Sequence, residues 1–274
     1  MDLQELRQQP HLSASAISGY MDCGLSYYLG RIIGVSPDFT PAPLVFGSAV
    51  HAVLAEFYQA LANGKRLSAR TLGALFEHYW QQMAEDRNDI QYKPGQDYAS
   101  LLLEGKELVV TFCHQLPEDT GTIIGIEEPF AFELEGLPMP IIGAYDLVLE
   151  DAAGTITIVD HKTSSRAFSN ADMDKNLQLT IYQMAARANG FAGREILLRF
   201  DALIKTKIPK FEQYYTIRSE WDELKARRKI LSVYEGISKG VFMPNEESWK
   251  CAGCQYKTAC KAWFEGGAYA QKSN

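Results

Sequence analysis

The spacing of hydrophobic residues changes once along the chain, near residue 120. Before that point apolar residues recur every three or four positions, as they do on one face of a helix. One helix is predicted from the capping residue Ser13, and a second from residues 47–48 to Asn63 and Gly64, a pair typical of a helix end. Residues 65–116 keep the helical spacing with more polar positions, and we expect them to form a helical insertion.

Beyond that point the apolar residues form short or alternating runs, which are typical of β-strands. Asp151 to Gly154 forms the predicted turn between two of them, and helices are predicted at 174–189 and at about 219–239. Strands that alternate with helices predict an α/β fold, a mixed central β-sheet flanked by helices, in a single domain over residues 1–274. The predicted strands are residues 123–126, 130–134, 141–149, 155–159, 196–203 and 211–217.

Composition is that of an ordinary globular protein, because 46% of the 274 residues are hydrophobic and 22% are charged. The first five residues, Met1 to Glu5, lack the basic start and apolar core of a signal peptide. No continuous apolar run approaches the ~20 residues that span a bilayer. We therefore expect a cytoplasmic protein that does not use a membrane.

The net charge of −7 argues at first against a polyanionic partner, but the charges are unevenly distributed. From Arg199 to Lys261 the chain has 13 Lys or Arg against 8 Asp or Glu. A basic face on an acidic protein is compatible with nucleic acid. A solvated, salt-bridged helix around residues 225–229 explains the same charges equally well.

The pattern that points to chemistry lies in the predicted strands: Gly143-x-x-Asp146, then thirteen residues, then Asp160-His161-Lys162. Asp160 and Lys162 are two apart on a strand, so they are expected on one face of the sheet. Two carboxylates can hold Mg²⁺ or Mn²⁺, which activates water and neutralises a phosphodiester. Lys162 would orient that water and stabilise the developing negative charge. The spacing alone is equally explained by an exposed Asp–Lys pair, with Asp146 capping a turn.

Two helices add further polar candidates. His51 follows Gly47 on an early helix, and Gln178 and Tyr182 lie four apart, hence on one helical face. Taken singly, each is as readily a packed or surface residue.

Three of the five cysteines crowd into ten residues as Cys251-x2-Cys254-x5-Cys260, which indicates a metal centre. Cys23 lies far away along the chain, near the end of the first predicted helix. Cys113 is left over, and a buried apolar role is expected for it.

In this order the motifs resemble the RecB-like nuclease domain of the PD-(D/E)xK superfamily: G-x3-H, G-x-x-D, D-x-K and Q-x3-Y. One cysteine near the N-terminus and three near the C-terminus resemble its iron–sulfur branch, which includes the AddB nuclease domain and the nucleases of CRISPR spacer acquisition. The resemblance runs from about Ser13 to Lys261 and implies a restriction-endonuclease-like core. Two positions depart from it: many relatives have Cys-Pro where Cys23-Gly24 stands, which could loosen that turn, and Tyr or Phe in place of His161.

The resemblance also implies roles for individual residues. Lys162 would be the catalytic lysine, and Gln178 and Tyr182 would position DNA or that lysine. A histidine ligand makes Mn²⁺ a good functional metal beside Mg²⁺. The implied metal ligands are His51, Asp146, Asp160 and the backbone carbonyl of His161.

For the cysteines the resemblance implies a [4Fe–4S] cluster that joins the N- and C-terminal regions as a structural staple. Four thiolates can also hold zinc, but zinc sites usually show two closely spaced cysteine pairs. The grouping of one plus three therefore favours iron. The implied ligands are Cys23, Cys251, Cys254 and Cys260.

The sequence thus predicts a metal-dependent DNA nuclease, an exonuclease acting on single-stranded DNA or DNA ends, in DNA repair, recombination or CRISPR spacer acquisition. A helicase would have to be a separate chain, because no Walker A motif is present, and CRISPR adaptation proteins are further candidate partners. Two alternatives remain open: a catalytically silent DNA-binding scaffold with the same fold, and a zinc-binding regulatory protein.

Overall fold

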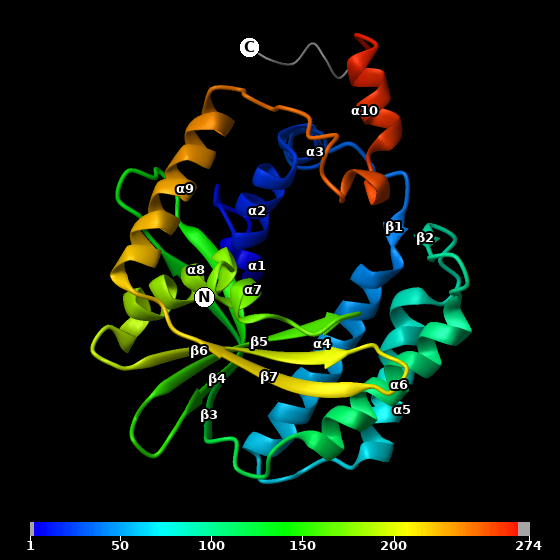
Figure 1. Ribbon diagram of the computed structural model, residues 1–274, viewed down its shortest axis with the longest axis vertical. Coiled ribbons are helices and arrows are strands. Elements are labelled where there is room, and N and C mark those ends of the chain that lie inside the picture. The colour runs from blue at the N-terminus through cyan, green and yellow to red at the C-terminus, as the bar shows by residue number, and fades with distance from the viewer. Residues whose placement is uncertain (1–2, 268–274) are drawn as a thin grey trace. The chain divides into compact units, whose positions relative to one another are not determined.

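A computed structural model describes residues 3–267 (Figure 1). Met1 and Asp2, which begin the segment compared above with a signal peptide, lie outside the described residues. The chain forms two compact units. Within the described residues, unit 1 comprises 3–40, 131–143 and 220–267, and unit 2 comprises 41–130 and 144–219.

A mixed sheet of five strands follows the order β3-β4-β5-β6-β7, which confirms the predicted fold class. β4 pairs antiparallel with β5, β5 parallel with β6, and β6 antiparallel with β7. The outer ends of β3 and β4 belong to unit 1, and the rest of the sheet belongs to unit 2. The strands are β3 (Thr122–Phe132), β4 (Ile141–Glu150), β5 (Ile156–Ser164), β6 (Ile196–Ile204) and β7 (Lys210–Thr216).

Local chemistry explains both connections around β5. In the turn from β4, Asp151 Oδ1 accepts hydrogen bonds from the N–H groups of Ala153 and Thr155, and Gly154 has a φ of +86°. This is the turn predicted at Asp151 to Gly154. The parallel connection to β6 passes through helices α7 (Asn170–Asp174) and α8 (Leu177–Ala186) and a π-helical turn (Arg187–Phe191). A parallel neighbour requires such a crossover.

Three long helices build the main core of unit 2: α4 (Ala42–Ala62), α5 (Ala69–Ala84) and α6 (Tyr98–Gln115), grouped beside the sheet in Figure 1. Ser68 caps α5, and Asp97 with Ser100 forms a capping box on α6. Their aromatic side chains pack in one cluster with residues of β5 and β6, so the segment predicted as an insertion shares the core of α4. The short strands β1 (Thr40–Pro41) and β2 (Ile90–Gln91) also pair.

Helix α4 begins earlier than predicted. The expected start at residues 47–48 is wrong: the helix begins at Ala42, and Pro43 lies in its first turn, where its missing N–H costs nothing. Among the described helices, α4 is also the one long and apolar enough to cross a membrane by length and composition. Its residues from Val45 to Tyr58 supply much of the core of unit 2, as a core helix of a folded protein would.

Two further boundaries differ from the prediction. The helix expected at 174–189 is divided: α7 ends at Asp174 with Lys175 as its C-cap. Asn176 then caps α8 by accepting a hydrogen bond from the N–H of Leu179 at 3.0 Å. The strands expected at 123–126 and 130–134 form one strand, β3, which Glu127 interrupts with a φ of 48° but does not end.

Unit 1 joins segments from both ends of the described chain. Tyr20 donates a hydrogen bond to the carbonyl of Val241 at 2.5 Å, and Lys250 pairs with Asp22 at 2.5 Å. The elements of unit 1 are α1 (Leu3–Leu6), α2 (Ala14–Asp22), α3 (Gly24–Tyr27), a π-helix (Tyr28–Ile33), α9 (Glu220–Ser238), a 3₁₀ turn (Cys251–Gly253) and α10 (Lys257–Phe264).

Gly24 is explained by this packing. A Cβ at Gly24 would lie 2.9 Å from the backbone nitrogen of Met243, and the N–H of Leu25 donates to the Met243 carbonyl at 3.2 Å. The departure from Cys-Pro therefore allows a close approach of the two chain segments.

The basic stretch from Arg199 to Lys261 is divided between the two units, so it is not one face of either. Many of its cations are also paired. Arg199 pairs with Asp201, Arg227 with Glu135 and Lys225 with Asp222. The salt-bridged alternative thus describes the segment around residues 225–229 better than a free basic face does.

Candidate active site

Asp146, Asp160 and Lys162 come together on the two strands where they were predicted. In the antiparallel β4–β5 ladder Leu147 pairs with Val159. Asp146 comes directly before Leu147 on β4, and Asp160 comes directly after Val159 on β5. Lys162 Nζ lies 2.5 Å from Asp160 Oδ2, so the two side chains share a face of the sheet. β5 continues to Ser164 instead of ending at residue 159, which places the whole Asp-His-Lys sequence within the strand.

The backbone of His161 ties His51 to the two strands. Its N–H donates to Asp146 Oδ2 at 2.7 Å, and its carbonyl oxygen lies 3.0 Å from His51 Nε2. His51 Nδ1 is 3.5 Å from Asp146 Oδ1. Helix α4 thus brings an imidazole to a carboxylate and a carbonyl oxygen, the oxygen and nitrogen donors that Mn²⁺ accepts.

Gln178 connects helix α8 to the same carboxylate. Its amide donates to Asp160 Oδ1 at 2.8 Å and to the hydroxyl of Tyr182 at 2.8 Å, while Lys162 Nζ donates to its carbonyl oxygen at 3.0 Å. The prediction that Gln178 and Tyr182 share one helical face is confirmed. Lys162 is held between two acceptors, which fixes the position of its ammonium group.

The two aspartates are buried but differ in ionisation. Asp160 is 2% exposed, and burial raises its pKa above the ordinary value, although Lys162 opposes the rise. Burial also opposes the ionisation of Asp146, but contact with His51 outweighs it and holds the pKa of Asp146 below its usual range. The same contact outweighs burial at His51 and raises its pKa. A divalent ion would add positive charge beside these two neighbouring carboxylates.

Glu127 is a candidate ligand that the sequence motifs did not reveal. One ligand atom each from His51, Glu127 and Asp146 lies within 4.8 Å of the other two, and this is the one such group of at least three potential ligands among the described residues. Burial, with the charge of Asp146, raises the pKa of Glu127 to about 7. The available signal was a carboxylate in an apolar strand segment, Ile123 to Ile126 followed by Glu127.

The imidazole of His161 points away from the carboxylates. It stacks on the ring of Tyr58 with centroids 5.5 Å apart and an interplanar angle of 5°. Burial lowers the pKa of His161 to about 4, so the side chain is neutral at pH 7. His161 reaches the site through its backbone alone, which agrees with the part assigned to its carbonyl.

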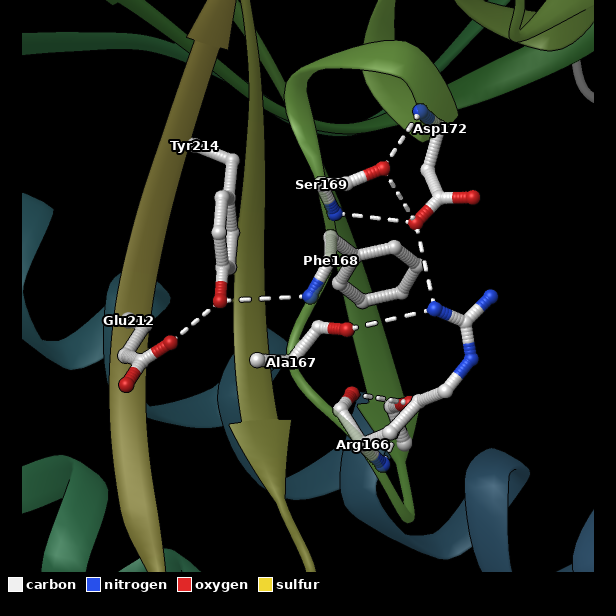
Figure 2. A network of polar contacts seen from close by, with 8 residues as sticks. Arg166, Ala167, Phe168, Ser169, Asp172, Glu212 and Tyr214 are labelled. Carbon is white, nitrogen blue, oxygen red and sulfur yellow. Dashed lines mark hydrogen bonds and ion pairs between the residues drawn. The ribbon is translucent and has the colours of Figure 1, made fainter.

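Hydrogen bonds hold the loop after β5 in place (Figure 2). Phe168 packs against Phe200, whose ring also lies 5.3 Å from Lys162 Nζ, and the Phe168 N–H donates to the hydroxyl of Tyr214 at 3.2 Å. Ser169 and Asp172 form a capping box on α7. Arg166 donates to Asp172 Oδ2 at 3.2 Å, yet its side chain remains 72% exposed.

The four cysteines predicted to bind a cluster all line one cavity of about 450 Å³ in unit 1. Burial raises the pKa of Cys260, and the other three thiols add to the rise. Among the described residues, no three cysteine sulfur atoms lie within 4.8 Å of one another. A tetrahedral zinc with Zn–S bonds of ~2.3 Å would need sulfur atoms roughly 3.8 Å apart. The thiols share a cavity without the close packing of a zinc site. Cys113 is separate, half-buried, with its sulfur near the Leu67 carbonyl.

Comparison with known families adds an independent finding. Residues 11–261 match the PD-(D/E)XK nuclease superfamily. No curated protein matches the sequence.

Two solved structures resemble the chain. The first is described as a proposed exonuclease from Eubacterium rectale, with 13% identity, a TM-score of 0.57, and coverage of 92% of this chain and 90% of that one. At this identity the likeness shows the fold alone. The second, SSO0001, has 14% identity, a TM-score of 0.38, and coverage of 90% of this chain and 94% of that one.

Proposed function

The chain belongs to the PD-(D/E)XK nuclease superfamily, and we propose that it hydrolyses DNA phosphodiester bonds with a divalent ion held by His51, Asp146 and Asp160. The observation that carries the proposal is the convergence of His51, Asp146 and the His161 carbonyl from α4, β4 and β5. Asp160, the residue before His161, lies close enough for its charge to raise the pKa of His51. A fold needs no such convergence of two buried carboxylates and an imidazole, whereas a metal site does.

The donor set fits Mg²⁺ or Mn²⁺, because it offers carboxylate and carbonyl oxygens and one imidazole nitrogen. When bound, the ion supplies an activated water and neutralises charge on the scissile phosphate. Lys162 lies next to Asp160, where its ammonium can hydrogen-bond the attacking water and the developing oxyanion. Gln178 holds Lys162 and Asp160 in register, and Tyr182 holds Gln178.

The proposed substrate is single-stranded DNA or a DNA end, cleaved as an exonuclease would, in the cytoplasm. Repair, recombination and CRISPR spacer acquisition are the settings that the motif resemblance supports, with a helicase or adaptation proteins as partners. A catalytically silent DNA-binding scaffold is the competing proposal. The intact pairing of Asp160, Lys162 and Gln178 favours the enzyme, since a site without turnover has no use for it.

A second part of the proposal concerns the thiols. Cys23, Cys251, Cys254 and Cys260 are proposed to hold a [4Fe–4S] cluster as a structural group. Their common cavity supports this assignment, and four thiolates are the ligand set that such a cluster takes.

End-labelled single-stranded DNA provides the test of the nuclease, with initial rates measured in Mg²⁺ and in Mn²⁺. We expect Asp160→Asn and Lys162→Ala each to lose at least about 10³-fold in rate, because removing one member of a catalytic unit costs nearly as much activity as removing all of them. Lys207→Ala, a change outside the site, should keep the wild-type rate. If the wild-type protein binds DNA in either metal without cleaving it, the scaffold proposal replaces the nuclease.

A further inference from the structure

A groove along one face of α4 leads to the metal site. It encloses about 520 Å³, within the range of small-ligand pockets, and every lining residue belongs to unit 2. Its walls include the two metal-site residues His51 and Glu127. The other lining residues, all from α4, are mostly small: Pro43, Leu44, Gly47, Ser48, Ala52 and Ala55.

Gly47 is not required by the fold. Glycine is, after proline, the least favourable residue inside a helix, and Gly47 lies within α4 without a positive φ. A Cβ there would meet only Thr163 Oγ1, at 3.9 Å, which is an ordinary contact. By comparison, a Cβ at Gly105 on α6 would lie 1.9 Å from the Phe76 ring. Packing within the protein explains Gly105. It does not explain Gly47, whose open space is available to a bound molecule.

The groove's chemistry restricts what that occupant can be. Its lining contains no lysine or arginine, so a phosphate would find no counter-charge away from the metal site. Leu44 is 63% exposed beside Pro43, an apolar contact surface that the core does not use. An uncharged, partly apolar group suits this lining, and a base with its deoxyribose is the neutral part of a nucleotide.

We propose that the α4 groove seats the base and sugar of the nucleotide next to the scissile phosphate, and that Gly47 keeps the helix surface open for it. This rests on the proposed function. The groove shares His51 and Glu127 with the candidate metal site, so a strand whose phosphate lies at the proposed ion has the groove directly beside it. Gly47 is a binding position in this arrangement and takes no part in the chemical step.

The experiment compares two mid-helix glycines. Gly73 on α5 also has room for a Cβ, with Lys106 Cε and Val110 Cγ2 at 3.9 Å, and it lies outside the groove. Gly47→Ala and Gly73→Ala should both raise Tm, by roughly 2–4 °C for a chain of this size. Only Gly47→Ala should raise KM for single-stranded DNA, about fivefold or more, with kcat little changed, and Gly47→Val should raise it further. Such a split is the signature of lost uniform binding.

Two measurements separate the possible failures. If wild-type protein does not cleave DNA, the proposed function fails. If it does and Gly47→Ala keeps the wild-type KM, the groove assignment is wrong and the nuclease stands. Mn²⁺ titration should give the same affinity for wild type and Gly47→Ala. Weaker Mn²⁺ binding by Gly47→Ala would mean that the glycine acts through His51, and this would also overturn the groove assignment.

Discussion

One ligand atom of Glu127 lies within 4.8 Å of those of His51 and Asp146, close enough to share an ion with them, and the pKa of Glu127 is raised to about 7. In the metal-free protein its proton must leave before the carboxylate can bind an ion. Metal affinity should therefore rise as pH increases toward 7, by up to about tenfold per pH unit, and Glu127 should add no further dependence above that.

Glu127→Gln is the variant that tests this role. We expect weaker Mn²⁺ binding at pH 8 and a flatter dependence of affinity on pH between 5 and 7, measured by calorimetric titration. The pH dependence of stability runs the other way: metal affinity rises with pH, whereas the contribution of Glu127 to folding stability falls. Because the folded-state pKa is raised above its ordinary value, Glu127 stabilises the protein below the unfolded pKa, near 4.5, and that contribution is lost as pH rises through about 7. The metal-free variant should consequently melt higher than wild type at pH 8. Unchanged affinity and an unchanged pH profile would remove Glu127 from the site.

Most site residues could be predicted because each lies at a fixed spacing within one element. Lys162 is two positions from Asp160 on a strand, and Gln178 and Tyr182 are four apart on a helix, so the period of each element fixes the common face. Glu127 could not be found this way. It reaches His51 and Asp146 from a different strand, and no local spacing encodes which strands become neighbours.

At the scale of elements, the loop between β5 and α7 lies next to the candidate active site. Phe168 and Lys162 contact the same Phe200 ring, so the exposed guanidinium of Arg166 stands two residues from the anchored point. The hydrogen bonds of Figure 2 restrain the loop before any substrate arrives, which reduces the entropy lost on binding. Arg166 is therefore expected to contact a phosphate of the bound strand.

The corresponding prediction uses a catalytically inactive Asp160→Asn background. Adding Arg166→Gln should weaken binding of single-stranded DNA and reduce the slope of log affinity against log salt by about 0.7, the value for one phosphate contact on a single strand. Arg70→Gln, an exposed arginine on α5, should change neither quantity. Equal slopes for Arg166→Gln and its parent would show that the loop does not touch the DNA backbone.

The order of elements was predictable from hydrophobic period, and their ends were less so. Each predicted strand overlaps an observed one, and Asp151 to Gly154 forms the expected turn. The predicted start of α4 was wrong by about one and a half turns, because the first turn contains Pro43, a residue that fits there but would break a helix further in. Asn176 is ambiguous in the same way. The sequence does not tell whether an asparagine within a helical pattern continues the helix or caps a new one, as Asn176 does for α8.

At the scale of the whole molecule, unit 1 brings both ends of the described chain to one cavity, which is lined by Cys23 and by the three cysteines of residues 251–260. A group that bonds Cys23 to Cys251 closes a loop of more than two hundred residues. In the chain-entropy account used for disulfides, such a link stabilises by more than about 4 kcal/mol.

Protein purified anaerobically should contain about four irons per chain, the inventory of the proposed cluster, with broad absorbance near 400 nm. Cys23→Ser should lose the iron and lower Tm by roughly 10 °C, if each kcal/mol is worth about 2–4 °C at this size. Cys113→Ser is the matched control, because its thiol lies apart from the cavity, and it should keep both iron and Tm. One zinc and no iron per chain would replace the cluster with a zinc site and leave the nuclease assignment untouched.

The origin of the donors also bears on how the protein reaches its working form. His51 and Asp146 are about a hundred positions apart, and β5 can join β6 only after the α7–α8 crossover has been threaded. Contacts this distant in sequence carry a large loop-closure entropy and form slowly. A nascent or partly folded chain would therefore lack the assembled ligand set, and the proposed hydrolysis would begin only once these late contacts have formed.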